Sequence, residues 1–348
     1  MRLKKNGNTY YREVNLKISR SMIAKEAGVT PTTVSCVLNN TRPVSAKVRA
    51  KVMAAIEKLN YVPDLAARAM LGKGSKQIFV MVDSIKNPFF AELVYSMEEA
   101  GIQKGYFFSI CGKMDMKTYV AHIIARKIDA VYFCSEIKNE EAVYVSQLLE
   151  NGIRILTSPK FKHFEGQISR IDMATGEAAR SAVRLLTAKG HTKIGFLNTF
   201  SDETQDDRLP LFRKEMLKNG LTPRCVPPDR TCFAGLESGR TLFRALMEAY
   251  PDTTAVLGIN DLVAIGAMNE AQRMGYRVPE DLSFVGIDGI ELSSLVTPRL
   301  TTYRSNASEL GKKAFEMLCQ LIETGEISSY THSLTLQEGE SVRDLKHV

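Results

Sequence analysis

The alternation of short apolar runs with amphipathic stretches after residue 76 most strongly limits how this 348-residue chain can fold. The apolar runs have the length of buried strands, and the stretches between them, such as 90–103 and 140–150, have the apolar spacing of helices. Strands that alternate with helices form a parallel sheet with helices on both faces. The runs form two series, at 78–82, 106–111, 130–134 and 153–157, and then at 193–198, 255–259 and 282–287. This pattern predicts two α/β lobes.

Positive charge is concentrated in the first 76 residues. The chain has 46 Lys and Arg against 39 Asp and Glu, and residues 1–76 hold fifteen of the bases but only four of the acids. That segment is therefore +11, and the remaining 272 residues are −4. A positive domain on a mildly acidic body is typical of proteins that bind the phosphate backbone, because their affinity rests on counterion release. A solvated basic tail is the alternative, and the residue pattern within the segment decides between them.

Residues 21–39 predict two short helices joined by a tight turn. Gly28 stands where a left-handed C-cap residue is needed, and Thr30 is a good N-cap with Pro31 at the first helical position. Small polar side chains on the outer face near the start of the second helix are what a helix in the major groove presents to bases and phosphates. These residues are Thr32, Thr33, Ser35 and Cys36.

A third helix follows the second after a short polar loop. Ser45 is its N-cap, and apolar residues repeat behind it at intervals of three and four, which completes a three-helix core. Basic residues at its start are placed to reach the phosphate backbone, although solubility alone would also explain them. They are Lys47, Arg49 and Lys51.

Several motifs of this segment resemble the head of the LacI family of transcription regulators. They agree in order and spacing at 27–35, 37–39, 44–45 and 59–63. The resemblance continues to 302, with matches at 87–90, 190–194, 259–261, 278–282, 285–288 and 297–302. It implies a small all-α helix-turn-helix domain followed by a two-lobed α/β core with parallel sheets, similar to periplasmic binding proteins. In that family the chain crosses three times between the lobes, and an effector binds between them.

The resemblance also sets the expected domain boundaries. Residues 1–18 form a basic extension beyond the family's usual start, which we expect to be disordered away from DNA. Residues 19–62 are the helix-turn-helix domain, and 63–75 are the hinge helix and linker. The core, 76–348, divides into lobe 1, about 76–173 and 306–325, and lobe 2, about 174–303 and 326–348.

The expected DNA contacts come from the head and the hinge. By resemblance, two hinges of a dimer open the minor groove with paired apolar side chains, and Met70 has the wedge position beside Arg68. Cys36 stands where the family commonly has an Arg that reads guanine, so the operator sequence of relatives does not transfer. The predicted DNA-binding residues are Ser19, Ser21, Thr30, Pro31, Thr32, Ser35, Asn39, Ser45, Arg68 and Met70.

The expected effector site lies where strands of the two lobes end. Ligands of open parallel sheets bind at the carboxyl ends of the strands, and a sugar or purine needs aromatic stacking with donors and acceptors beside it. Leu211 and Met173 replace the Gly and Asn usual in the family, so the effector is expected to be unusual or absent. The predicted effector-binding residues are Phe89, Phe90, Arg208, Asn260 and Asp288.

Other functional classes lack support in the sequence. There is no GxSxG, HExxH or phosphate-cradling glycine motif, and the five histidines are isolated, so we expect no enzyme, no metal site and no cofactor. The six cysteines are scattered without a CxxC pair, as reduced thiols would be. No apolar run is long enough to span a membrane, and the first residues lack a secretory signal, so a cytoplasmic location is expected.

The sequence thus predicts a homodimeric repressor that binds double-stranded operator DNA and responds to a small molecule, a carbohydrate or related metabolite. A core that responds to a protein partner, or to no ligand, is an alternative that the sequence leaves open. A solute-binding protein of a transport system would have the same core. The basic head and the missing signal peptide argue against that third interpretation.

Overall fold

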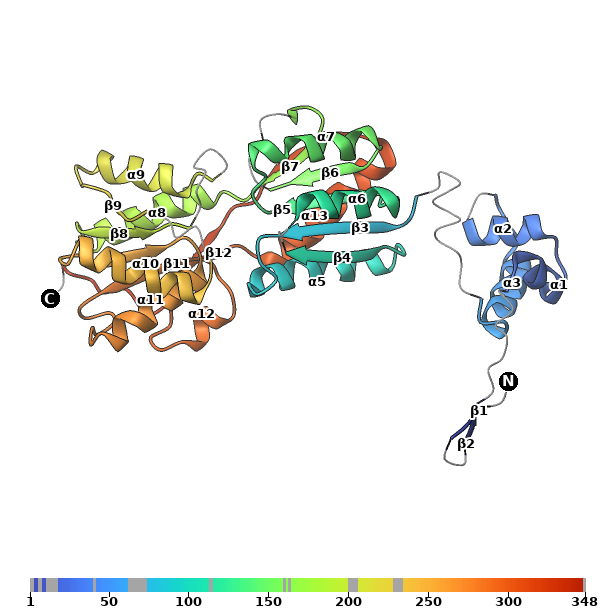
Figure 1. The fold of residues 1–348 in the computed structure, drawn as a ribbon, viewed down its shortest axis with the longest axis horizontal. Coiled ribbons are helices and arrows are strands. Elements are labelled where there is room, and N and C mark those ends of the chain that lie inside the picture. The colour runs from blue at the N-terminus through green and yellow to red at the C-terminus, as the bar shows by residue number, and fades with distance from the viewer. Residues whose placement is uncertain are drawn as a thin grey trace. The chain divides into compact units, whose positions relative to one another are not determined.

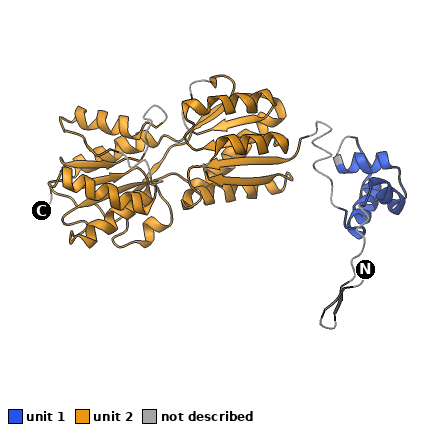
Figure 2. Ribbon diagram, viewed as in Figure 1, with its two compact units in different colours: residues 1–67 blue, residues 68–348 orange. Residues whose placement is uncertain are grey.

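The chain folds into two compact units, residues 1–67 and 68–348 (Figure 2). The computed structural model describes residues 3–5, 8–10, 18–39, 42–61, 74–112, 115–158, 161, 164–199, 206–227 and 234–346. The predicted hinge contacts Arg68 and Met70 lie outside these residues.

The first unit contains the predicted three-helix core. Its helices are α1 (Arg20–Ala27), α2 (Pro31–Asn39) and α3 (Ala46–Lys58). Apolar side chains of all three helices meet in a small core that includes Ile23, Val34 and Val52, each with no exposed surface. Ile18, at the end of the predicted extension, also packs against this core.

The basic extension contains a short ribbon that the sequence did not predict. Strands β1 (Leu3–Lys5) and β2 (Asn8–Tyr10) pair antiparallel, with Leu3 opposite Tyr10. A two-stranded ribbon alone is marginally stable in water, because it has no third strand or helix to cover a face. We predicted disorder for the extension, and residues 11–17, which follow the ribbon, lie outside the described residues.

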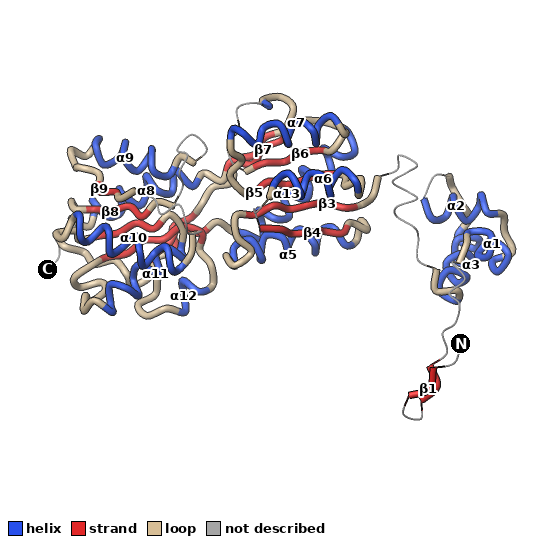
Figure 3. The backbone as a smooth tube through the Cα atoms, in the orientation of Figure 1, coloured by secondary structure: helices blue, strands red, loops and turns tan. Residues whose placement is uncertain are grey.

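Lobe 1 of the second unit is a six-stranded parallel sheet in the order β13-β7-β6-β5-β3-β4 (Figures 1 and 3). Alternate residues of β3 point to opposite faces: Val80 packs with α5 and α13, and Met81 packs with α6 and α7. Both faces are buried, which explains the continuous apolar run of this strand. The strands are β3 (Gln77–Val82), β4 (Phe107–Gly112), β5 (Ala130–Cys134), β6 (Arg154–Thr157), β7 (Ser169–Asp172) and β13 (Ser329–Thr331). The helices are α5 (Pro88–Ile102), α6 (Met116–Ala125), η1 (Asn139–Glu141), α7 (Ala142–Glu150) and α13 (Ala307–Thr324).

Lobe 2 repeats this plan in the order β14-β12-β11-β10-β8-β9, with β14 antiparallel to its neighbour. Helix α8 packs beside α9, and α10 packs beside α11. The strands are β8 (Ile194–Leu197), β9 (Arg224–Cys225), β10 (Ala255–Gly258), β11 (Ser283–Asp288), β12 (Thr301–Arg304) and β14 (Thr335–Gln337). The helices are α8 (Thr175–Ala188), α9 (Arg208–Lys218), α10 (Leu236–Ala249), α11 (Asp261–Arg273) and α12 (Leu292–Leu295). Among the described residues, no helix combines the length and apolarity that a membrane span needs.

The chain crosses between the two sheets three times, after β7, after β12 and after β13. The third crossing corrects the predicted boundary near residue 326, because β13 belongs to the sheet of lobe 1. It pairs with β7, with Tyr330 opposite Ile171, and the backbone N–H of His332 extends the pairing to the carbonyl of Asp172 at 2.7 Å. A three-residue edge strand has too little apolar pattern to be recognised in the sequence.

The close contact between α5 and α13 gives a test of this packing. A Cβ atom at Gly311 would lie 2.3 Å from the carbonyl oxygen of Leu93, so Gly311→Ala must push the two helices apart. We expect a loss of about 1–3 kcal/mol in the free energy of unfolding, measured by denaturant titration. Gly112→Ala is the control, since nothing lies within 4 Å of that Cβ position. Equal stability of the two variants would contradict the packing.

Candidate functional site

The turn between α1 and α2 sets the angle of the predicted recognition helix. Gly28 has a φ of 63°, in the left-handed region where a side chain would be strained, and its backbone N–H closes the end of α1. Thr30 then begins α2, because its Oγ1 accepts a hydrogen bond from the backbone N–H of Thr33 at 3.2 Å. Val29 packs on the head core between the helices. The predicted helix-turn-helix is therefore present.

The predicted contacts on α2 lie on its outer surface. Thr30, Pro31 and Thr32 are exposed, and Ser35 is partly exposed, while Val34 and Val37 of the same helix are buried. The backbone of Asn39 is helical, but its side chain lies outside the description. The structure thus presents a small polar face at the start of α2, and contact of this face with bases stays a prediction.

Three serines predicted to bind DNA lie at the beginnings of α1 and α3. The side chains of Ser19 and Ser45 accept hydrogen bonds from the backbone N–H groups of Met22 and Val48, at 3.3 and 3.4 Å. Both serines therefore cap helices, and their hydroxyl hydrogens can still donate to phosphate oxygens. Ser21 is exposed in the first turn of α1.

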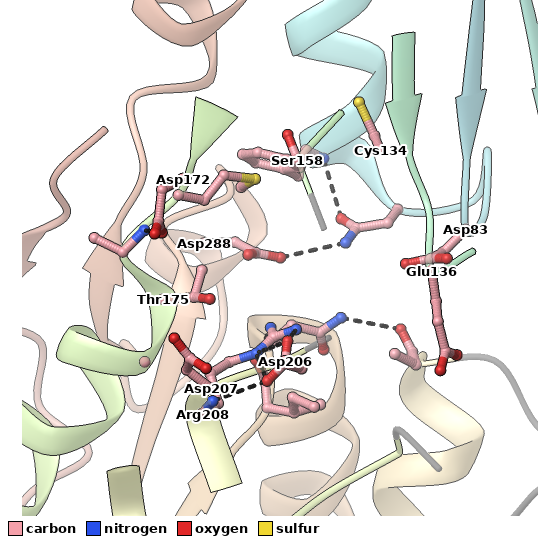
Figure 4. A pocket seen from close by; sticks show the side chains of 18 of the residues that line it. Asp83, Cys134, Glu136, Ser158, Asp172, Thr175, Asp206, Asp207, Arg208 and Asp288 are labelled. Atoms are coloured by element: carbon pink, nitrogen blue, oxygen red, sulfur yellow. Dashed lines mark hydrogen bonds and ion pairs between the residues drawn. The ribbon is translucent and has the colours of Figure 1, made fainter. Parts of the chain in front are cut away.

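The five residues predicted to bind an effector line one cavity between the lobes. The cavity has a volume of about 260 Å³ and lies at the carboxyl ends of the strands in both sheets. Figure 4 shows side chains from the two lobes facing one another across it. The five are Phe89, Phe90, Arg208, Asn260 and Asp288. Their contact with an effector stays a prediction.

Arg208 is buried and already held by lobe 2. Its Nε donates to both carboxylate oxygens of Asp206, at 3.0 and 2.9 Å, and its Nη1 donates to the carbonyl oxygen of Ile259 at 2.7 Å. Burial lowers the pKa of Arg208, but the adjacent Asp206 carboxylate outweighs this effect and raises the pKa above its ordinary value. The guanidinium is therefore a fixed cation neutralised by its neighbour.

Asp288 links the two lobes. The side-chain amide of Asn87, from lobe 1, donates to its carboxylate at 3.2 Å, and the backbone φ of Asp288 is 128°, a conformation that favours glycine. Burial first, and the charge of Asp261 second, raise the pKa of Asp288 to about 8, although Arg208 acts in the opposite direction. A strained, buried carboxyl at a cavity wall is typical of a binding site.

Asn260 and the two phenylalanines also have structural roles. Asn260 caps α11 through the backbone N–H of Val263 at 2.8 Å, and its amide nitrogen donates to the carbonyl of Ala234 at 3.1 Å. Phe89 is only 3% exposed and meets Phe90 edge-on, with ring centroids 5.3 Å apart. These contacts leave Phe90 more accessible than Phe89 for stacking on a ligand.

Acidic residues around the cavity were missed in the sequence. Asp83 directly follows β3, and Glu136 lies two residues after β5, so the rule that ligands meet strand ends would have found both. Asp206 and Asp207 lie at the start of α9, where no strand signal precedes them. Among the described residues, no group of three His, Cys, Asp or Glu side chains can hold a metal ion.

Comparison with protein families gives two matches. Residues 22–64 match the model described as bacterial regulatory proteins, lacI family, and residues 183–342 match a periplasmic binding protein-like domain. The first matched segment coincides with the head, and the second covers most of lobe 2 together with α13 and β13 of lobe 1.

Curated relatives match over almost the whole chain. The HTH-type transcriptional repressor PurR of Aliivibrio salmonicida is 31% identical over 311 residues, which is 86% of this chain and 91% of the relative. The repressor of the same name from Vibrio cholerae is 30% identical over 336 residues, 93% of this chain and 97% of the relative.

A solved structure has a similar fold. The crystal structure of the lac repressor dimer bound to operator and the anti-inducer ONPF is 25% identical and has a TM-score of 0.79. The match covers 94% of this chain and 99% of that chain.

The raised pKa of Asp288 predicts a pH-dependent stability. Its proton is bound more tightly in the folded state, so the residue's contribution to the free energy of unfolding is full below pH 4 and falls until about pH 8. We expect Asp288→Asn to gain about 1 kcal/mol or more relative to the unchanged protein between pH 5 and 8, since a tenfold difference in proton affinity is worth about 1.4 kcal/mol. Denaturant titration at several pH values measures this gain.

Asp281→Asn is the control, because a pairing with Arg277 lowers the pKa of that exposed carboxyl to about 2. Removal of the Asp281 carboxylate should lower the free energy of unfolding above the ordinary pKa of aspartate and leave it unchanged at low pH. If Asp288→Asn and Asp281→Asn changed stability with pH in the same direction, the burial of Asp288 as a protonated group would be wrong.

Proposed function

Since the chain belongs to the LacI family of bacterial regulatory proteins and is a DNA-binding transcriptional repressor, not an enzyme, we propose that it acts as a homodimer on a pseudo-palindromic operator. Each α2 helix enters the major groove of one half-site, and the two hinges meet at the centre, with Met70 as wedge and Arg68 in the minor groove. Because the protein acts on operator DNA, we infer that it works in the cytoplasm. A small molecule in the cavity between the lobes controls operator affinity.

The exposed polar start of α2 within a strongly positive segment carries this proposal. Thr32 points outward from a helix whose opposite face is buried in the head core. The +11 charge of residues 1–76 supplies affinity for any duplex, and the polar face supplies the discrimination between duplexes.

An apolar surface on lobe 1 supports the dimer. Tyr95 and Ile102 of α5 are 61% and 63% exposed, and Phe107 on the edge strand β4 is 62% exposed. Helix α5 packs beside β4, so these exposed side chains lie on neighbouring elements at the β4 edge of the sheet. Exposed apolar side chains gathered on an edge strand and its neighbouring helix favour burial against a second copy. The related lac repressor crystallised as a dimer on its operator.

The cavity supports control by a small molecule. An effector shifts operator affinity only if it binds one arrangement of the lobes better than another, and a site whose walls come from both lobes allows such a difference. A sugar or related metabolite is the class that the sequence favoured. A protein partner docked on the core, or a core without a ligand, is the second candidate.

Selection from a random duplex pool tests the proposal. The purified full-length chain should enrich a pseudo-palindrome, and titration of that site at two salt concentrations should give a steep slope, about −0.9 per phosphate neutralised. No enrichment would contradict sequence-specific repression and leave a non-specific basic anchor.

Thr32 on α2 should contribute to specificity. Thr32→Ala removes a hydroxyl from the outer face, so we expect a loss of about 1 kcal/mol or more for operator DNA and little for random DNA. Lys47→Ala should instead weaken both duplexes and reduce the salt slope, because a phosphate contact carries no sequence information.

Met53→Ala is the matched control, since Met53 is a 52% exposed side chain on α3 that has no predicted DNA contact. Fluorescence anisotropy on both duplexes gives the comparison. An equal loss by Thr32→Ala on operator and random DNA would contradict base reading by α2.

Phe107 should lie in the dimer interface. Phe107→Glu places a charge where apolar surface is to be buried, and we expect the mass measured by sedimentation to fall to that of a monomer at micromolar concentration. Leu217→Glu is the matched control, because Leu217 is 66% exposed on α9 in lobe 2. A dimer that tolerates Phe107→Glu as well as Leu217→Glu would place the interface elsewhere.

A further inference from the structure

An aspartate holds the segment through which the chain enters lobe 1. Residues 74–76 directly precede β3. The Asp129 carboxylate accepts hydrogen bonds from the backbone N–H of Ser75 at 2.6 Å, from the Ser75 hydroxyl at 3.0 Å and from the backbone N–H of Lys76 at 2.9 Å. Hydrogen bonds to a carboxylate are stronger than those between neutral groups, so three of them fix the position of this segment. We call residues 74–76 together with Asp129 the linker anchor.

The backbone of the linker anchor is shaped to meet the carboxylate. Gly74 has a φ of 73° and Lys76 a φ of 57°, and a residue with a side chain keeps such a left-handed conformation only where its surroundings hold it. A Cβ atom at Gly74 would lie 3.0 Å from Oδ2 of Asp129, so glycine allows the close approach. Ser75 is only 1% exposed, and the Nζ of Lys76 lies 4.1 Å from the centre of the Tyr106 ring. Several independent contacts therefore hold the segment in place.

Asp129 itself belongs to the centre of the lobe 1 sheet. It directly precedes β5, which lies between β6 and β3 (Figure 1). Its backbone N–H donates to the carbonyl of Gln77 at 3.0 Å, and its carbonyl accepts from the N–H of Arg154 at 3.1 Å. Strands β3 and β5 run from the linker anchor to the cavity between the lobes, where Asp83 and Glu136 follow their carboxyl ends. The same two paired strands thus carry the anchor at one end and cavity-lining residues at the other.

From these contacts we propose that Asp129 is a positioning residue for operator binding, because it fixes the point at which the linker leaves lobe 1. The inference rests on the proposed function, since it requires the two heads of a dimer to bind one operator. Binding of the second head is then intramolecular, and its strength depends on the length and placement of the connection to the core. Each residue released from the linker anchor lengthens that connection and lowers the effective concentration of the second head at its half-site.

Random DNA separates a positioning role from a purely structural one. The positive charge of residues 1–76 binds the phosphates of any duplex, and such binding requires no fixed spacing between two heads. Loss of the linker anchor should therefore weaken binding to the operator and leave binding to random DNA nearly unchanged. Loss of folded protein would instead weaken both in proportion.

The test measures the affinity of the full-length chain for the selected operator and for a random duplex by fluorescence anisotropy. Asp129→Ala removes all three hydrogen bonds, and we expect operator affinity to fall about fivefold or more and random-duplex affinity to change less than about twofold. Asp252→Ala is the matched control on lobe 2 and changes the net charge equally. That carboxylate also has three partner atoms, at 2.6 and 3.1 Å in Arg224 and at 2.8 Å in Lys193. Equal operator affinities of the two variants would overturn the proposal.

Two milder variants keep the test decisive if Asp129→Ala does not fold. Ser75→Ala removes the hydroxyl donor alone and should cause a smaller loss in operator affinity. Asp129→Asn keeps an acceptor for Ser75 but places an amide N–H against the N–H of Lys76, so we expect it to weaken operator binding as well. In the double variant of Ser75→Ala and Asp129→Asn the two losses should not add, because both residues act through one contact. Operator binding by both single variants that equals binding by the unchanged protein would overturn the proposal.

The outcomes separate this inference from the proposed function. If the unchanged chain enriches an operator that Asp129→Ala binds equally well, the proposed function stands and the positioning role is wrong. If the unchanged chain enriches no operator, the proposed function is wrong, and a role of Asp129 on DNA fails with it. Amide hydrogen exchange tests the linker anchor without DNA, because Ser75 and Lys76 should exchange faster in Asp129→Ala than in Asp252→Ala. Equal exchange in the two variants would overturn the anchor itself.

Discussion

The core depends on the junction between its two lobes, where Asn87 of lobe 1 donates a hydrogen bond to Asp288 of lobe 2. All strands of the two sheets except β14 run parallel to their neighbours. Their carboxyl ends therefore lie between the lobes and bring polar side chains together there. Burial of a carboxyl at this junction is costly unless it is protonated or paired with a charge. The Asn87 amide offsets part of this cost and joins the two lobes at the cavity wall.

The two units differ in charge and in the kind of surface that they present. The head holds the positive charge and a short polar helix face, and the core holds an acidic cavity with apolar walls. We propose that a small molecule in the cavity changes operator affinity by shifting the arrangement of the lobes.

The regular elements could be predicted because their signals are local. The strand 130–134 begins and ends as the alternation of apolar and amphipathic stretches indicated, and Gly28 and Thr30 have the cap roles that their residue types predicted. Short edge strands such as β13 and β9 could not be predicted, since three or two residues carry no periodicity. Because β13 was not predicted, the third crossing was placed too early in the chain. Pairing with β7 assigns β13 to lobe 1, and the three residues of β13 do not indicate that pairing.

The sequence by itself determined the alternating α/β pattern, the basic three-helix head and the family, because strand period, helix caps and net charge are properties of residue type and order. It also named the five residues that meet in the cavity. Only the tertiary structure decided that Arg208 is held by Asp206, that Asn260 is used as a cap, and that acids from both lobes face one another. Those facts depend on distances between residues far apart in the chain, and no local pattern records such distances.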